Sequence, residues 1–400
     1  MNGGASRRSL VRLALTVLLA GCSEELTQPG QCPELCPGGT PQGEEEILTV
    51  LPNQDSTFTG YTQRSNGTVL LVGSAIPTPA DTSLGVLVFR ARPDSVTFRD
   101  TLRPYTVDSV RLSLLAVAHD TAVRHATVQL YRLPSSIDTT TLSYAGVSPF
   151  FTPANLIGAD QLPDTALADT VRVLVKGPQL STVALQPADN GRLVIGIAVV
   201  GDAPTGGRIG NQGSVVPPEF LTYVTPTVAN PAVTSLSEPV TFTGYFGRQT
   251  PTIDPTLLTV GGVPSSRALL RFPWPAKLRD SATIVRATLE LVPAQPVAGL
   301  PHDPGTLNVR GLATDFGAKS PIEPASLGFL PLAANVTDTV RVEIATVVQL
   351  WQRGLRPPAV FLSITPEVET FTRAVFGSSR SGAPARIRVN FLPRFPFSRP

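Results

Sequence analysis

The chain has 400 residues, 42% of them hydrophobic and 16% charged, with a formal net charge of +2 at pH 7. This composition excludes a chain that is disordered throughout, and the small net charge gives no long-range attraction to nucleic acid, so we expect no nucleic-acid partner. The 40 prolines and 33 glycines predict many short strands joined by turns rather than long helices. With only three cysteines and three histidines, we expect no metal and no cofactor.

Residues 1–21 have the pattern of a secretory signal peptide. Three arginines, at positions 7, 8 and 12, precede an apolar run over residues 13–20. That run is about half of the ~20 residues that a membrane-spanning helix needs, so we do not expect a retained transmembrane helix.

The end of this apolar run carries a more specific signal. Leu19-Ala20-Gly21-Cys22 resembles the lipobox of bacterial lipoproteins. The resemblance implies that the Cys22 thiol receives a diacylglycerol, which anchors the mature protein on a membrane. An ordinary signal peptide with an incidental cysteine is the alternative. Ser23, in place of Asp, implies the outer membrane of a two-membrane bacterium and leaves open which face of that membrane.

Residues 22–46 are predicted to form a flexible tether, because they are rich in Pro, Gly and Glu and show no apolar period. Cys32 and Cys36 lie in this tether, and in an oxidising compartment they are candidates for a small disulfide loop. Free or intermolecular thiols are one alternative. Half of a metal site is another, although no further cysteine or nearby histidine is left to complete it.

Beyond residue 46 the chain repeats itself at long range. Thr57-Phe58-Thr59-Gly60-Tyr61 recurs at residues 241–245, and Asp169-Thr170-Val171-Arg172-Val173 recurs at residues 338–342. Weaker matches between these two keep their order while the offset drifts. Such a drift indicates a duplicated domain whose two copies have loops of different length.

The duplication predicts a first domain over residues 47–228, as the divergent copy, and a second over residues 235–393, with a linker near 224–238. Most segments alternate apolar and polar residues, as half-buried strands do. Residues 193–200 and 359–364 are almost wholly apolar and predict strands that are buried on both faces. The expected fold class is all-β, with an antiparallel, jelly-roll-like β-sandwich in each half.

One segment of the second half has helical spacing. Apolar residues at positions 344, 347, 348 and 351 share one helix face, and Gly354 is a good helix stop. We therefore predict a short helix at one end of the second sandwich, with Trp351 in the core.

Several motifs of the second half carry a family resemblance. They are residues 254–261 (DPTLLTVG), 268–272 (ALLRF), 284–291 (IVRATLEL), 340–342 with the Trp351 helix, and 383–389 (APARIRV). Over about residues 239–393 the chain resembles the DNRLRE-type repeat domain of secreted bacterial proteins, which is related to the carbohydrate-binding-like domain of disaggregatase. The resemblance implies a β-sandwich of the kind found in carbohydrate-associated proteins, and it implies no shared active site.

Recognisable catalytic motifs are absent from the sequence. The chain contains no Gly-x-Ser-x-Gly turn, and its acidic residues form no recognisable glycosidase pair. His119, His125 and His302 are interpreted as surface histidines, and residues 206–210 (GGRIG) as a hairpin or long loop rather than a phosphate-binding loop. We therefore do not expect an enzyme, and an envelope hydrolase or lyase with an unrecognised site is the remaining alternative.

Trp274 is the candidate ligand-binding residue. It lies between Pro273 and Pro275, just after a predicted strand, and an exposed ring there would stack on the apolar face of a sugar. Packing of the ring in the core is the alternative.

Together these features predict a non-catalytic lipoprotein of the cell envelope that is anchored through Cys22 and presents tandem sandwiches for binding. A polysaccharide, with peptidoglycan among the candidates, is the expected partner. The alternative is a structural or scaffolding subunit that docks to another envelope protein.

Overall fold

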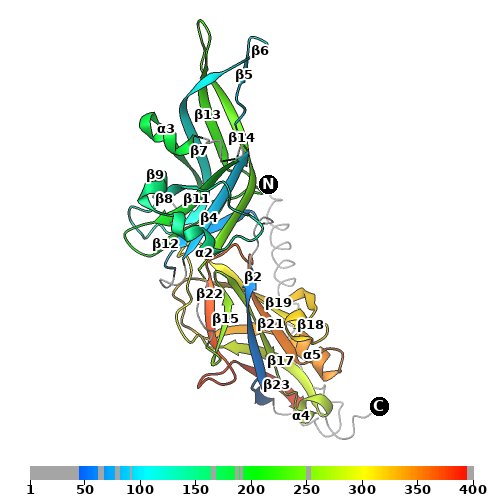
Figure 1. Ribbon diagram of the computed structural model, residues 1–400. Coiled ribbons are helices and arrows are strands. Elements are labelled where there is room, and N and C mark those ends of the chain that lie inside the picture. The colour runs from blue at the N-terminus through cyan, green and yellow to red at the C-terminus, as the bar shows by residue number, and fades with distance from the viewer. Residues whose placement is uncertain are drawn as a thin grey trace, which may run out of the picture. The chain divides into compact units, whose positions relative to one another are not determined.

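Antiparallel strands dominate the structure (Figure 1). The computed structural model describes residues 45–61, 67–76, 82–90, 92–163, 168–184, 189, 192–248 and 254–393. Helices within these residues are short, and none of them is long and apolar enough to cross a membrane. The predicted all-β fold class is therefore confirmed.

A ten-stranded sheet contains most of the strands from the first half of the chain. Its order is β14-β13-β7-β12-β3-β4-β11-β8-β9, with β10 beside β7. Because β14 pairs with β13 through its first part and with β4 through its second, the sheet folds around its own core. The strands are β3 (Val69–Ser74), β4 (Ser83–Arg90), β7 (Tyr105–His119), β8 (Thr127–Leu133), β9 (Leu156–Gln161), β10 (Asp169–Lys176), β11 (Arg192–Val200), β12 (Thr205–Gly210), β13 (Glu219–Pro226) and β14 (Thr234–Gly247).

Small elements decorate this sheet. They are the hairpin of β5 (Val96–Phe98) and β6 (Thr101–Arg103), the helices α2 (Tyr144–Val147) and α3 (Leu180–Val183), and the 3-10 turns η1 (Ser148–Phe150), η2 (Pro153–Asn155) and η3 (Gly177–Gln179).

The remaining strands form a two-sheet sandwich, called here the second sandwich. Its four-stranded sheet has the order β1-β23-β17-β20 and contains β1 (Glu46–Val50), β17 (Ala282–Leu291), β20 (Val340–Glu343) and β23 (Arg386–Pro393). Its seven-stranded sheet has the order β19-β18-β21-β16-β15-β22, with β2 also beside β16. The strands of this sheet are β2 (Gln54–Tyr61), β15 (Leu257–Gly261), β16 (Ser265–Arg271), β18 (Gly305–Leu312), β19 (Ile322–Leu332), β21 (Ala359–Thr365) and β22 (Arg373–Gly377). The helices are α4 (Ala276–Asp280), α5 (Ala345–Gln352) and the 3-10 turn η5 (Gly317–Lys319).

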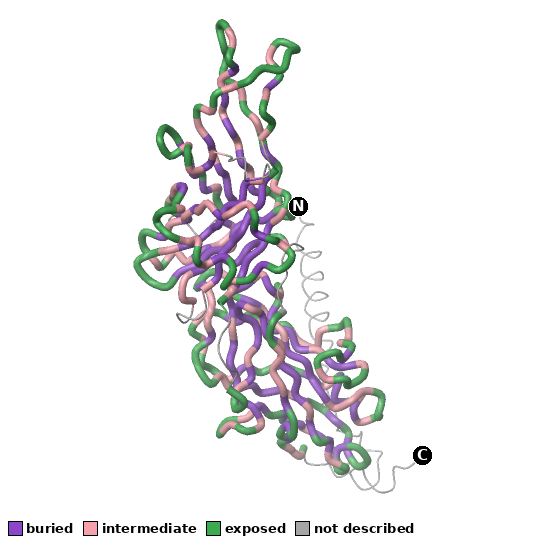
Figure 2. Tube along the Cα trace, in the orientation of Figure 1, coloured by how far each residue is buried: buried purple, intermediate pink, exposed green. Residues whose placement is uncertain are grey.

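Buried residues follow the strands, as the purple segments of Figure 2 show, and most of them are apolar. One core lies between the two sheets of the second sandwich, and another lies within the ten-stranded sheet. Burying one Val, Leu, Ile or Phe side chain contributes about 1.5–3 kcal/mol, so these cores supply the main driving force for folding. The mostly apolar strands β11 and β21 are buried on both faces nearly throughout, as predicted. The predicted helix is also confirmed as α5.

The two copies of the Thr-Phe-Thr-Gly-Tyr motif exchange partners across the predicted domain boundary. Residues 57–61 lie in β2, which pairs with β16 in the second sandwich. Residues 241–245 lie in β14, which pairs with β4 in the ten-stranded sheet. Each copy thus adds a strand to a sheet made largely by the other half of the sequence. The division into domains at residues 47–228 and 235–393 stays a prediction, but the strand pairing crosses both boundaries.

Two local predictions are wrong. The expected linker over residues 224–238 is a hairpin, because β13 and β14 pair from Glu219–Pro239 to Val224–Thr234. The glycine-rich residues 206–210 form most of β12, which pairs with β3 and β7. Glycine is needed there because a Cβ at Gly206 would lie 3.1 Å from the Gly73 Cα of the neighbouring strand.

Candidate functional site

The structure removes Trp274 from the ligand-binding candidates. Its side chain is 9% exposed and belongs to the core of the second sandwich. The ring packs edge-on against Trp351, with the two ring centroids 5.6 Å apart. Phe272 stacks on the same Trp351 ring, with a centroid distance of 6.1 Å. The ring of Trp274 therefore offers no open face to a sugar, and the packing alternative describes it. The three predicted cysteine sites, Cys22, Cys32 and Cys36, lie outside the described residues.

The histidines differ from one another in their surroundings. His119 is only 3% exposed, with its Nε2 2.6 Å from the Pro163 carbonyl oxygen, so its interpretation as a surface residue is wrong. It is buried because β12 and β7 pair next to it. His125 is exposed and lies 2.7 Å from an Asp202 carboxylate oxygen, and His302 is also exposed. No group of three or more acidic, histidine or cysteine side chains in the described part of the chain could hold a metal ion.

The candidate site is a cavity of about 160 Å³ at one end of the second sandwich. Segments that are far apart in the sequence meet there: the β1–β2 turn, the end of β16, the β18–β19 loop and the start of β21. Backbone hydrogen bonds join them, since the Asn53 N–H donates to the Arg271 carbonyl at 3.0 Å and the Phe272 N–H donates to the Pro358 carbonyl at 2.8 Å. The lining residues are Asn53, Gln54, Arg271, Phe272, Asp315, Pro357, Pro358 and Ala359.

An ion pair forms one wall of this cavity. The Arg271 guanidinium binds Asp315 in a bidentate fashion, through Nε to Oδ2 and through Nη2 to Oδ1 at 2.7 Å. The hydrogen bond from Arg271 lowers the pKa of Asp315, and the Gly317 N–H, 3.1 Å from Oδ1, lowers it further. The same pairing raises the pKa of Arg271. Both side chains are therefore charged at neutral pH and are held in a fixed orientation.

Two amides complete the polar lining. The side chains of Asn53 and Gln54 make no hydrogen bond to another side chain or backbone group within the described ranges. Each amide offers both donors and an acceptor, which are the complement of a sugar hydroxyl. These groups are available to a ligand without first breaking a contact inside the protein.

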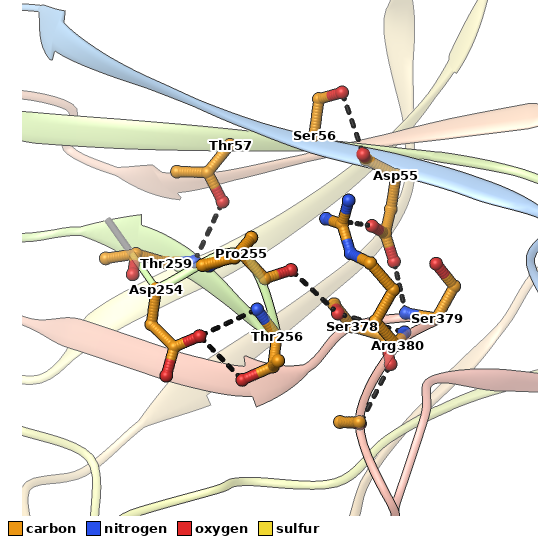
Figure 3. A network of polar contacts seen from close by, with 11 residues as sticks. Asp55, Ser56, Thr57, Asp254, Pro255, Thr256, Thr259, Ser378, Ser379 and Arg380 are labelled. Carbon is orange, nitrogen blue, oxygen red and sulfur yellow. Dashed lines mark hydrogen bonds and ion pairs between the residues drawn. The ribbon is translucent and has the colours of Figure 1, made fainter. Parts of the chain in front are cut away.

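A polar network fixes β2, and with it the amide of Gln54. The Asp55 side chain is fully buried and accepts hydrogen bonds from the Ser379 N–H and from the Arg380 guanidinium at 3.2 Å (Figure 3). Two residues further along β2, the Thr57 hydroxyl accepts from the Thr259 N–H at 3.2 Å. Strand β2 is thereby tied to β15 and to the turn after β22.

An exposed aromatic residue follows the acid of this ion pair in the chain. Phe316 follows Asp315 directly and is 71% exposed. Its backbone N–H donates to the Ser320 hydroxyl at 2.8 Å, and η5 begins at the next residue, so the loop that carries the ring is ordered by its own contacts. An exposed ring on an ordered loop, together with fixed polar groups nearby in the chain, is the combination that a sugar-binding surface needs.

The proposed cavity lies near Trp274 in the chain but does not include it. Trp274 lies three residues after Arg271, which lines the cavity, whereas Phe316 comes from a distant loop. Asn53 and Gln54 belong to a segment that the sequence assigns to the first domain. Only the run Asp315-Phe316-Gly317, with an acid and an aromatic residue before a glycine turn, could have marked this loop.

Comparison with protein-family models gave no match, and comparison with curated proteins gave none either. The resemblance to the DNRLRE-type domain therefore stays a prediction from the quoted motifs.

Proposed function

We propose that the protein is a cell-envelope lipoprotein, anchored through Cys22, that binds a polysaccharide through the 160 Å³ cavity of the second sandwich. The observation that carries the binding proposal is that two unengaged amides and the bidentate Arg271–Asp315 pair line one cavity, with the exposed Phe316 directly after Asp315 in the chain. The lipobox and the tether-like composition of residues 22–46 support the anchoring part of the proposal.

The chemistry of the cavity favours binding over hydrolysis. A glycosidase needs two carboxyl groups, one of which has a raised pKa and acts as the acid. Asp315 is the one acidic side chain among the described residues that line the cavity, and its pKa is lowered by Arg271. A permanently charged, immobilised carboxylate can accept hydrogen bonds from sugar hydroxyls but cannot protonate a leaving group.

The dimensions point to a shallow site on an extended ligand. The cavity volume of about 160 Å³ is below the roughly 300–1,000 Å³ of pockets that enclose drug-sized molecules. We therefore infer that one sugar residue of a polymer enters the cavity while its neighbour stacks on Phe316. Affinity for a single sugar would be low, and repeated contacts along an insoluble polymer would raise it.

A retention assay on insoluble polysaccharides, including peptidoglycan, tests this proposal. The assay uses the mature chain with Cys22→Ser, which prevents lipidation. We expect Phe316→Ala and Asn53→Ala each to weaken retention by up to about tenfold, because a stacked ring contributes about 0.5–1.5 kcal/mol. Phe329→Ala is the matched control, since Phe329 is a similarly exposed ring, at 63%, on β19 of the same sandwich.

Retention that Phe316→Ala weakens and Phe329→Ala does not would support polysaccharide binding at this cavity. Equal loss in both variants would contradict the assignment of the site. Absence of retention on every polymer would contradict polysaccharide binding itself and favour docking to another envelope protein.

A further inference from the structure

A second cavity, of about 260 Å³, lies between α4, α5 and the start of β17. Two guanidinium groups, two side-chain amides and one hydroxyl surround this small space, and no acidic side chain of the described chain lines it. Its lining residues are Arg279, Thr283, Ile284, Gln349, Gln352 and Arg353. None of them lines the Asn53 cavity, so the two sites can be tested separately.

Hydrogen bonds fix the walls of this cavity. The short strand β20 ends at Glu343, and α5 then continues beside β17, where the Ile344 N–H donates to the Ala287 carbonyl at 2.7 Å. The Gln352 amide nitrogen donates to two carbonyls of the α4–β17 turn, Leu278 at 2.6 Å and Ala282 at 2.9 Å. Because these bonds use its nitrogen, Gln352 contributes mainly to holding the helix, and the other polar groups are left for a ligand.

Both arginines of this cavity are exposed and lack an acidic partner among the described residues, as several other exposed arginines do. Arg271, Arg267 and Arg356 each bind a carboxylate, whereas neither Arg279 nor Arg353 forms an ion pair with any residue that the structure describes. Arg279 makes one hydrogen bond, from Nη2 to the Trp274 carbonyl at 3.3 Å. The cavity therefore carries two positive charges without a counter-charge from a side chain.

Helix dipoles do not account for these charges. Arginine near a helix C-terminus is favourable because the unpaired carbonyls carry about half a negative charge. Arg353 follows α5 directly and Arg279 lies in the last turn of α4, a helix of five residues. Even if each helix contributed the full half charge, about one positive charge would be left over in the cavity.

We propose that this cavity binds a phosphate monoester group. Such a group carries a charge of about −1.5 to −2 at pH 7 and three terminal oxygens, and guanidinium groups bind phosphate oxygens in pairs. The Thr283 hydroxyl and the Gln349 amide supply further donors. A carboxylate, with only two oxygens, would leave more of these donors unsatisfied. The phosphate could be carried by an envelope sugar or by a lipid headgroup.

Isothermal titration calorimetry of the mature Cys22→Ser chain tests this assignment. The ligands are glucose 6-phosphate, glucose, glucuronate and dihexanoyl phosphatidate. We expect glucose 6-phosphate to bind at one site, glucose not to bind, and glucuronate to bind at least about tenfold more weakly. Replacing both arginines, Arg279→Gln with Arg353→Gln, should weaken phosphate binding at least about tenfold, because hydrogen bonds to charged groups contribute about 1.5–3 kcal/mol each.

The matched control replaces two exposed arginines elsewhere, Arg103→Gln on β6 with Arg172→Gln on β10, which changes the net charge by the same amount. Binding of glucose 6-phosphate alone would identify a sugar phosphate as the ligand. Binding of the phosphatidate, alone or together with glucose 6-phosphate, would show that the site also accepts a lipid headgroup. Equal affinity for glucuronate, unchanged binding in the Arg279–Arg353 variant, or equal loss in the control would overturn the proposal. Loss of polysaccharide retention with phosphate binding intact would overturn only the proposed function.

Discussion

Replacing Trp274 by alanine should destabilise the second sandwich without removing a ligand contact. Truncating a buried Trp or Phe to Ala costs about 3–5 kcal/mol, through lost burial and the cavity that is left. Trp274 is nearly fully buried against Trp351, so it should fall in this range before one correction. Its indole Nε1–H has no hydrogen-bond partner in the described structure, and removing such a donor recovers about 1 kcal/mol. The expected cost is therefore about 2–4 kcal/mol.

Urea denaturation followed by circular dichroism measures this loss, because the signal does not depend on the two tryptophans. Phe316→Ala is the natural comparison, since truncating an exposed ring should change the free energy of unfolding by less than about 0.5 kcal/mol. The two variants should thus separate stability from binding: Trp274→Ala lowers stability, and Phe316→Ala lowers polymer retention. A Trp274→Ala protein as stable as the wild type but unable to bind the polymer would refute the placement of Trp274 in the core.

Three further predictions concern the exchanged strands and two buried acids that they carry. Asp55→Ala should lower the unfolding free energy in urea by about 2–3 kcal/mol, because a fully buried carboxylate loses its bonds to Ser379 and Arg380; no change would mean that these bonds do not hold β2. Burial raises the pKa of Glu238 from 4.5 to about 7, so the folded state holds this proton up to a higher pH than the unfolded state does. The free energy of unfolding should therefore fall by up to about 3 kcal/mol as the pH rises from 4.5 to about 7. Glu238→Gln should abolish this fall, and an unchanged pH profile would contradict the assignment. Residues 235–393 alone should show no cooperative thermal transition, because the four-stranded sheet then lacks β1 and the seven-stranded sheet lacks β2. Adding a chemically synthesised peptide of residues 46–61 should restore the transition.

The candidate site could be predicted only in part. The sequence marks the region after β16 as a rigid loop with an aromatic ring, and one residue of that region, Phe272, lines the cavity. It does not reveal that Trp274 points into the core, because burial depends on the packing of α4 and α5 over the ring. Nor does it bring Asn53 to Arg271, since that contact joins segments more than 200 residues apart.

Local patterns by themselves determined the fold class, the doubly buried strands and the helix α5. Alternation, apolar runs and glycine or proline turns act within a few residues, so they can be read without knowing the neighbours. Tertiary structure alone decided which strands pair. The two Thr-Phe-Thr-Gly-Tyr copies have the same local preference, yet β2 pairs with β16 and β14 with β4. The identity of a strand's partner depends on which edges and cores are left uncovered by the rest of the chain, and that information is not local.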